Sequence, residues 1–326
     1  MDTTDSIKEK GLYPDEKSFL EFCGKNGIFS HYEFGFHECW SADFVLAALP
    51  ALLALQRFDL ARQHLQNLAR RQGRTGRMPE WYIGDYPAWF WKKMANTKVS
   101  QLKTKASLFP PGNTETLFII GLHEYARLAE DLDFLAKYKT VLHKAVVFME
   151  KKWFLEGSGL VKSRTSQTPK LLDNILLYRA YCLLGEGQKS YARKAEWLRD
   201  NINDRFWCGY YQTAIESKEL DLLSSTLAVL FGVAPHDLYE SLGEGLSEVE
   251  IKLDSPNLGF VILALKKIGG KAEIRAQELF HDWQTATQQK GGLAYMAENA
   301  LMLFCQKTLE GVFPDDRQGN SGGKKG

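Results

Sequence analysis

The sequence contains few cysteines, and their spacing does not suit cross-linking or metal binding. Five occur in 326 residues, an odd number, and no Cys-x-x-Cys pair is present. A disulfide framework or a zinc knuckle would need paired spacings. No nucleotide-binding or metalloprotease motif is found either. We therefore expect reduced thiols, as is typical of cytoplasmic proteins, with no metal and no cofactor.

Long apolar runs are also missing. The longest, residues 44–55, is shorter than the stretch of about 18 apolar residues that indicates a membrane span. The first 20 residues are polar and lack the apolar centre of a signal peptide. The sequence therefore predicts a cytoplasmic protein without a membrane span.

Neither sign of charge dominates. Lys and Arg total 41 and Asp and Glu total 40, a net charge of +1, which gives no electrostatic drive toward nucleic acid. Hydrophobic residues make up 44% and charged residues 25%, close to the averages for soluble globular proteins. The composition excludes disordered, collagen-like and coiled-coil chains. We expect a small-molecule partner, and nothing in the sequence specifies an oligomeric state.

The apolar pattern is helical throughout. Some segments are apolar around most of their circumference, which is typical of helices buried on all sides. They are 41–55, 114–129, 170–184, 219–232, 257–268 and 293–306. Between them lie amphipathic segments with one wet face: 59–72, 132–152, 188–204, 236–249 and 271–288, with 14–23 as a further candidate.

A buried helix followed by an amphipathic helix, about six times over, predicts an all-α fold. The variable spacing argues against a solenoid of fixed period. We predict an (α/α)6 toroid, a barrel of six helical hairpins, as a single domain over residues 1–314. Residues 315–326 are rich in Gly, Ser and Lys and are expected to form a disordered tail.

The connections indicate where a site would lie. Links from a buried helix to the next amphipathic one are short, whereas the return links are often long. In a ring of hairpins the inner helices run parallel, so the long links gather at their N-termini. Functional residues concentrate on loops held by a rigid scaffold, so we place the site there. Alternatively, these loops only fill the open end of the ring and have no role in binding.

Polar residues open the inner helices with some regularity. Capping of helix N-termini would place such residues there in any case. Together, however, they would line one mouth with the acceptors that a polyol ligand needs. The examples are Ser41, Asp43, Asn113, Thr114, Glu115, Asp173, Asn174, Glu219, Asp221, Asp254, Ser255, Asn257, Glu298 and Asn299.

The segment EWYIGDYPAWFW, residues 80–91, is rich in aromatic residues. Aromatic faces stack on sugar rings while carboxylates bind the hydroxyls, although such a cluster could also simply hold a lid together. The long link that contains it favours a functional lid or binding loop. Just before the first inner helix, His31 and His37 are acid–base candidates. Three further histidines, His64, His143 and His281, are expected on outer-helix surfaces, and His123 is expected in the core.

Three stretches of the sequence resemble the six-hairpin glycosidases, the superfamily of glucoamylase, trehalase, neutral invertase and glycogen-debranching glucosidase. The run HECWSADFVLAALPALLALQRFDLARQHLQNLARRQGRTGRMPEW resembles their first hairpin. NTETLFIIGLHEYARLAEDLDFLAKY resembles the second hairpin and LDLLSSTLAVLFGVAP the fourth. The matching residues of the first are Trp40, Asp43, Ala61, Arg62, Gln72, Gly76, Met78 and Pro79. The resemblance covers roughly residues 30–306 and implies the toroid and a carbohydrate substrate.

The sequence departs from that family at its usual catalytic positions. Ala42 stands where the family often has Arg, and Asn113 where it has Asp. The link before the third inner helix contains one carboxylate, Glu156, and the link before the sixth contains none. Inverting hydrolysis needs one protonated carboxyl and one that activates water. Our candidates are therefore Asp173, as general acid, and Glu298, as general base.

Three functions stay open at this stage. The first is hydrolysis of a small soluble glycoside, with Asp173, Glu298 and Asp43 as the catalytic candidates. The second is a non-hydrolytic epimerase, lyase, isomerase or cyclase on the same barrel, including one that takes an apolar substrate. The third is an inactive ligand-binding protein. The proposed substrate contacts are Trp40, His37, Glu38, Glu80, Trp81, Tyr86, Trp89, Asn113, Glu115 and Arg164.

Overall fold

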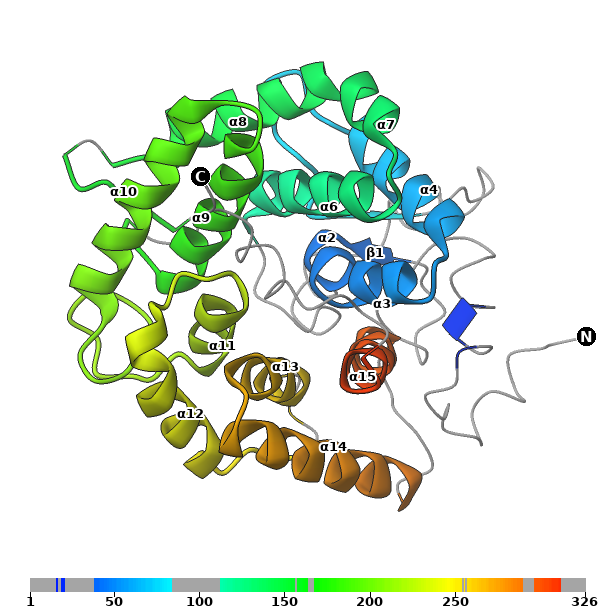
Figure 1. The fold of residues 1–326 in the computed structure, drawn as a ribbon. Helices are drawn as coiled ribbons and strands as arrows, with labels where there is room; N and C mark the ends of the chain where they lie inside the picture. The colour runs from blue at the N-terminus through cyan, green and yellow to red at the C-terminus, as the bar shows by residue number, and fades with distance from the viewer. Residues whose placement is uncertain are drawn as a thin grey trace, which may run out of the picture.

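The computed structural model is an all-α toroid, which confirms the predicted fold class (Figure 1). It describes residues 16, 19–20, 38–83, 112–155, 157–163, 167–253, 255, 257–289 and 296–311. The predicted outer helix 14–23 and the predicted tail 315–326 lie almost wholly outside these residues. None of the described helices is both long and apolar enough to cross a membrane.

An inner ring of helices surrounds the axis and an outer ring surrounds the inner one. The inner elements are α2 (Ser41–Asp43), η1 (Phe44–Ala48), α3 (Leu49–Ala54), α6 (Thr114–Leu128), α9 (Leu171–Gly185), α11 (Leu222–Leu230), α13 (Leu258–Ile268) and α15 (Met296–Leu309). The outer elements are α4 (Phe58–Arg70), α7 (Leu132–Lys137), α8 (Lys139–Trp153), α10 (Lys189–Phe206), η3 (His236–Leu238), α12 (Tyr239–Glu248) and α14 (Lys271–Gln289).

The first inner helix changes its winding along its length. Residues 44–48 form a π-helical turn, and the amide of Leu49 bonds to the carbonyl of Phe44. Pro50 follows directly and has no N–H to bond the carbonyl four residues earlier. Pro50 would interrupt the hydrogen bonds of a regular α-helix here, and the wider π-helical turn lies directly before it.

The ring closes where its last inner helix meets its first. Helix α15 packs against η1 and α3 on one side and against α13 on the other. Gly259 makes the second contact close, because a β-carbon at this position would lie 2.4 Å from Cγ of Leu301. The absence of a side chain therefore sets how near α13 and α15 can approach.

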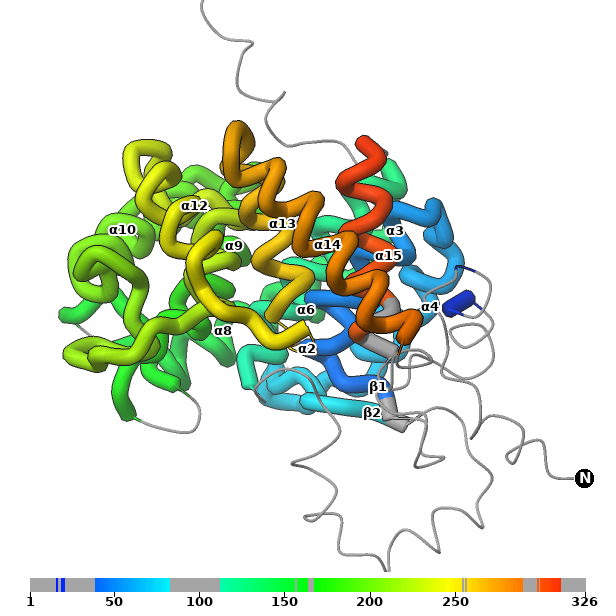
Figure 2. The backbone as a smooth tube through the Cα atoms, turned by 90° about the horizontal axis from the view of Figure 1, so that it is seen from below, coloured from blue at the N-terminus to red at the C-terminus, as the bar shows by residue number. Residues whose placement is uncertain are grey.

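A short antiparallel pair, β1 (Glu38–Trp40) and β2 (Trp81–Ile83), lies at one end of the toroid (Figure 2). The helical pattern of the sequence did not predict it. Behind it, Nδ1 of His64 lies 2.6 Å from the Tyr82 hydroxyl, and the His64 ring packs 5.2 Å from that of Phe44. The prediction of His64 as a surface residue is wrong. It is 1% exposed because it lies on the inward face of α4.

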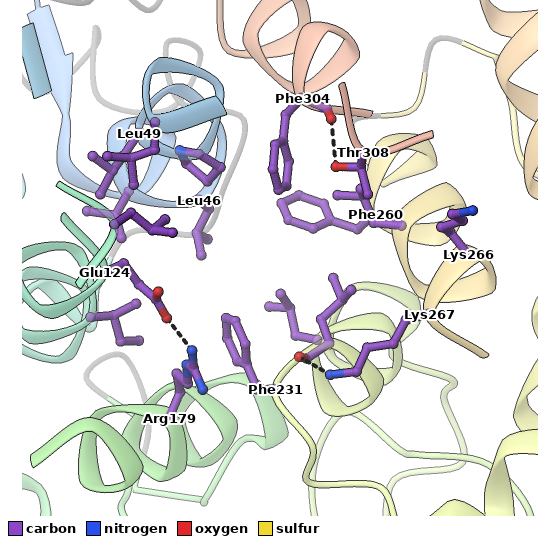
Figure 3. Close-up of a pocket in the computed structure, with 18 of the residues that line it drawn as sticks. Leu46, Leu49, Glu124, Arg179, Phe231, Phe260, Lys266, Lys267, Phe304 and Thr308 are labelled. Carbon is purple, nitrogen blue, oxygen red and sulfur yellow. Dashed lines mark hydrogen bonds and ion pairs between the residues drawn. The ribbon is translucent and has the colours of Figure 1, made fainter. Parts of the chain in front are cut away.

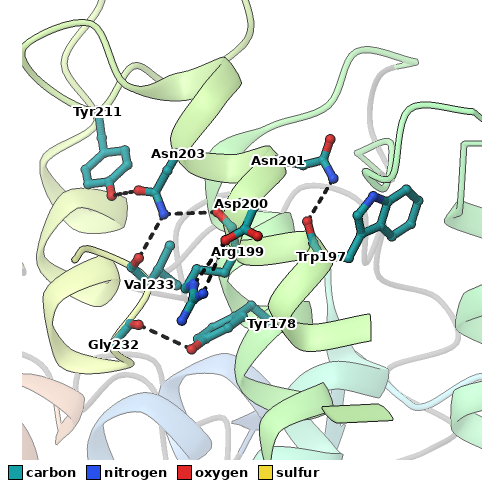
Figure 4. A network of polar contacts seen from close by, with 9 residues as sticks. All are labelled: Tyr178, Trp197, Arg199, Asp200, Asn201, Asn203, Tyr211, Gly232 and Val233. Atoms are coloured by element: carbon teal, nitrogen blue, oxygen red, sulfur yellow. Dashed lines mark hydrogen bonds and ion pairs between the residues drawn. The ribbon is translucent and has the colours of Figure 1, made fainter. Parts of the chain in front are cut away.

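Polar contacts hold the third hairpin against the fourth (Figure 4). The Asn203 amide on α10 donates to the Val233 carbonyl at 3.0 Å and accepts from the Tyr211 hydroxyl. Tyr178 on α9 donates to the Gly232 carbonyl at 3.2 Å. These bonds connect α9 and α10 to the turn that follows α11, so they fix the spacing of neighbouring inner helices.

Candidate functional site

The first turns of four inner elements bring carboxylates to the same end of the toroid. Parallel helices place equivalent turns in one layer, as the sequence predicted. Glu298 lies in the first turn of α15 as the structure describes that helix, from Met296. All four side chains are buried: Asp43 is 2% exposed, Glu115 3%, Asp173 8% and Glu298 9%.

Asp173 is the most distinctive of these groups. Its Oδ1 accepts a hydrogen bond from the Asn113 amide, while its buried Oδ2 has no hydrogen-bond partner among the described residues. Burial raises the pKa of Asp173, although hydrogen bonds from Asn113 and Ser163 act in the opposite direction. A carboxyl whose pKa is raised in this way is suited to act as a general acid.

Asn113 reaches Asp173 from an unusual backbone conformation. It precedes α6 with φ of 53°, in the left-handed region that asparagine tolerates better than most residues. Its side chain makes no capping bond to its own helix and is directed to α9 instead. The structure therefore joins two predicted site residues from different hairpins.

Asp221 is a neighbour of Asp173 that the sequence analysis did not pair with it. Its charge also contributes to the raised pKa of Asp173. Asp221 caps α11 by accepting from the amide of Ser224 at 2.9 Å. The two aspartates lie at the N-terminal ends of successive inner helices. The predicted hairpin repeat could therefore have indicated that they are close.

Asn174 has a structural task beside the site. It accepts from the Val161 amide at 2.8 Å and donates to the Val161 carbonyl at 3.1 Å. A further bond goes to the carbonyl of Lys170 at 2.8 Å. Asn174 thus fixes the link that enters α9, so that the backbone around Asp173 is well anchored.

Glu115 connects the second inner helix to the turn before β2. Its Oε1 accepts from the Met78 amide at 2.9 Å, and Thr114 donates to the Met78 carbonyl at 3.2 Å. Burial raises the pKa of Glu115, against these hydrogen bonds. The contacts explain why a carboxylate is tolerated here, because a buried polar group needs partners.

Replacing Glu115 by glutamine is expected to change the pH dependence of stability. The native pKa lies above the unfolded value, so the wild type loses stability as pH rises through that window. Glutamine keeps the Met78 bond and does not titrate. Urea titrations should show Glu115→Gln gaining stability relative to wild type as pH rises from 4.5 to 7, whereas Glu244→Gln on the exposed face of α12 should show no such trend. A constant difference between Glu115→Gln and wild type would contradict this interpretation.

Aromatic residues adjoin the carboxylate layer. Trp40 and Trp81 pair across β1 and β2 with ring centroids 6.3 Å apart and planes tilted by 40°. Trp40 is buried and Trp81 is half-buried. The hairpin is tied to α2 because Ser41 donates from its amide to the Glu80 carbonyl at 2.9 Å and from its hydroxyl to the Pro79 carbonyl at 2.7 Å.

Several predicted contacts are described only in part or not at all. Glu80 is half-buried, with an oxygen 3.9 Å from the Arg77 guanidinium. Glu38 is placed by its backbone, opposite Ile83. The remaining predicted contacts, His37, Tyr86, Trp89 and Arg164, lie outside the described residues. Among the residues that are described, no cluster of three or more metal-ligating side chains occurs.

A second feature, which the sequence analysis missed, is a cavity along the axis. It has a volume of about 450 Å³ and is lined chiefly by the C-terminal halves of the inner helices, away from the carboxylate layer (Figure 3). Apolar side chains, chiefly leucine and phenylalanine, form most of its wall, together with Glu124 and Arg179. Such a space depends on how side chains pack across the axis, which helical periodicity does not specify.

The fold is similar to that of solved glycosidases. An alpha-amylase from Clostridium perfringens superposes with a TM-score of 0.62 at 15% identity, covering 88% of this chain and 96% of that one. A glycosidase in complex with glucose gives 0.62 at 10% identity, covering 91% and 95%. A rhamnosidase from Klebsiella oxytoca with rhamnose bound gives 0.62 at 14%, covering 86% and 60%. No family model and no curated protein matches the sequence.

Proposed function

We propose that the protein is a glycoside hydrolase that acts on a small soluble glycoside at the carboxylate layer. The observation that carries the proposal is the state of Asp173: buried, with a raised pKa and with one oxygen lacking a partner among the described residues. The likeness of the fold to solved glycosidases supports the same class.

In the proposed reaction Asp173 is the general acid and Glu298 the general base. Asp173 donates its proton to the glycosidic oxygen as the bond from that oxygen to the anomeric carbon breaks. Glu298 takes a proton from water, whose oxygen forms the new bond to that carbon. This inverting scheme requires the two carboxyls to be about 6.5–9.5 Å apart with the substrate between them. Asp43, the third catalytic candidate, would orient the sugar or the water.

Substrate contacts would come from the hairpin and the helix N-termini. Trp81 offers aromatic surface for the apolar face of a sugar ring, with the buried Trp40 beside it in the proposed set. Glu80, Asn113 and Glu115 offer hydrogen-bonding groups for the hydroxyls. The sequence-based candidates Glu38, His37, Tyr86, Trp89 and Arg164 belong to the same proposed set.

A non-hydrolytic reaction on the same barrel is the second candidate, and Asn113 favours it. An amide cannot transfer a proton at neutral pH, and here it donates to Asp173 where the family resemblance implied a second carboxyl. The loss of that carboxyl favours an epimerase, a lyase, an isomerase or a cyclase, for which the remaining carboxylates of the layer would supply acid–base groups.

A ligand screen by thermal shift tests the proposal. We expect one of a panel of mono- and disaccharides to raise the melting temperature by several degrees, since a ligand at about 100 times its Kd adds about 2.7 kcal/mol to the free energy of unfolding. Asp43→Asn should abolish the shift, whereas Asp282→Asn on the exposed face of α14 should keep it.

Incubation with the stabilising sugar and chromatography of the products then separates the candidate functions. Hydrolysis products support the glycosidase, and an isomerised or unsaturated sugar supports the second candidate. A sugar that binds and is recovered unchanged favours an inactive binding protein. Stabilisation by isoprenoid-type apolar compounds alone would contradict a sugar substrate.

A further inference from the structure

The axial cavity at the far end of the toroid has the size of a small-molecule pocket. Its volume of about 450 Å³ is within the range of roughly 300–1,000 Å³ that small-molecule pockets occupy. Phe231, Phe260 and Phe304 lie around it in Figure 3, with Leu46 and Leu49 on the opposite wall. This wall would bury an apolar body and offers few partners for the hydroxyls of a sugar.

The charges that line the cavity are mostly positive. The described lining contains one carboxylate, Glu124, and the cationic side chains of Arg127, Arg179 and Lys267. Lys266 contributes as well, but in Figure 3 it points away from the space, and it pairs with Glu273. An apolar wall with an excess of cations suits a ligand that is apolar at one end and anionic at the other.

Favourable interaction with helix dipoles explains the positions of some of these cations. Arg127 lies in the last turn of α6 and Lys267 in the last turn of α13, where positive charge complements the free carbonyls. Lys267 donates to the Leu230 carbonyl at the end of α11, at 2.8 Å. Arg179 is different, because it lies in the interior of α9, away from the C-terminal carbonyls.

Arg179 shares its carboxylate with a second guanidinium. Glu124 bonds to Arg179 and also accepts from Arg127 Nη2 at 2.8 Å, so one negative charge faces two positive ones. The Arg179 and Glu124 side chains are 19% and 18% exposed, and Nε of Arg179 is buried without a hydrogen-bond partner among the described residues. A half-buried cation in this setting is stabilised by a further anion.

We infer that the cavity binds an amphipathic carboxylate, with its alkyl chain against the phenylalanine and leucine wall and its head group near Arg179 and Lys267. The two ends of such a ligand match the two kinds of lining. This site would be separate from the carboxylate layer, and its occupancy does not depend on glycoside hydrolysis.

Calorimetric titration of the full chain with octanoate tests this inference. We expect saturable binding with one octanoate per protein, and at least tenfold weaker binding of 1-octanol, which lacks the charge, and of acetate, which lacks the chain. Thr308→Trp, at a half-buried lining position, should weaken octanoate binding at least tenfold by filling the space. Lys267→Gln should weaken it severalfold while the glutamine still donates to the Leu230 carbonyl.

Arg179→Gln should also weaken octanoate binding tenfold or more. If Arg179→Gln does not fold, the affinity of Thr308→Trp for octanoate tests the inference instead, because Thr308→Trp leaves the ion pair between Arg179 and Glu124 intact. Lys271→Gln, exposed on α14 and away from the lining, is the matched control and should bind normally. Equal affinity for octanol and octanoate, absence of saturable octanoate binding, or wild-type affinity in Thr308→Trp would overturn the inference.

Discussion

Asp173→Asn is expected to lower kcat/KM for the identified glycoside by roughly 10²–10⁴-fold, the usual contribution of a general acid. Asparagine keeps the shape of the side chain and an oxygen that can accept from Asn113, but it has no proton to give. The melting temperature should stay close to that of the wild type, because the variant removes a carboxyl whose pKa burial already raises. Steady-state assays on the sugar found by the ligand screen provide the measurement.

The leaving group distinguishes loss of the acid from general damage to the site. A nitrophenyl glycoside of the same sugar releases a stable anion and needs little protonation, so Asp173→Asn should retain far more activity on it. In the wild type, activity on the natural glycoside should fall as pH rises through the raised pKa of Asp173, and this limb should be missing from the variant. Equal losses on both substrates would exclude Asp173 as the acid.

Gly76→Ala is expected to reduce the free energy of unfolding by about 3 kcal/mol, through backbone strain and a steric clash. Gly76 has φ of 101°, and a β-carbon there would lie 2.1 Å from the backbone carbonyl oxygen of Lys144. The Lys144 carbonyl belongs to α8 and cannot rotate away as a side chain could. Urea denaturation followed by circular dichroism measures the loss.

Gly73 is a matched control three residues earlier in the same turn. A β-carbon there would meet the Arg77 carbonyl oxygen at 3.4 Å, an ordinary contact, so Gly73→Ala should change stability by no more than about 0.5 kcal/mol. The turn also carries Met78, whose amide bonds to Glu115. If both alanine variants are equally stable, the close approach of this turn to α8 does not explain why position 76 needs glycine.

The ring of helices could be predicted because burial on all sides leaves a strong local signal. The segment 114–129 was expected and α6 spans Thr114–Leu128, for example. The predicted outer helix 132–152 is interrupted, since α7 ends at Lys137 and α8 begins at Lys139. Strands β1 and β2 have three residues each and pair across a long separation, so neither shows a pattern of its own.

The candidate site was predictable in its layer but not in its contacts. Carboxylates in the first turns of parallel helices must share one end of the barrel, and Asp43 and Asp173 do lie in the first turns of α2 and α9. The bond between Asn113 and Asp173 depends instead on the left-handed backbone at Asn113, which sequence spacing does not reveal. The axial cavity likewise depends on which side chains leave space at the centre.

The contact of α15 with η1 and α3 also has a consequence for synthesis on the ribosome. About 240 residues separate the end of α3 from the start of α15. At about 5–20 residues per second, the apolar flank of the first helix waits roughly 12–50 seconds for its final neighbour. Throughout that interval the nascent chain is an open arc with two uncovered apolar edges, so we expect it to engage chaperones until the last helix emerges.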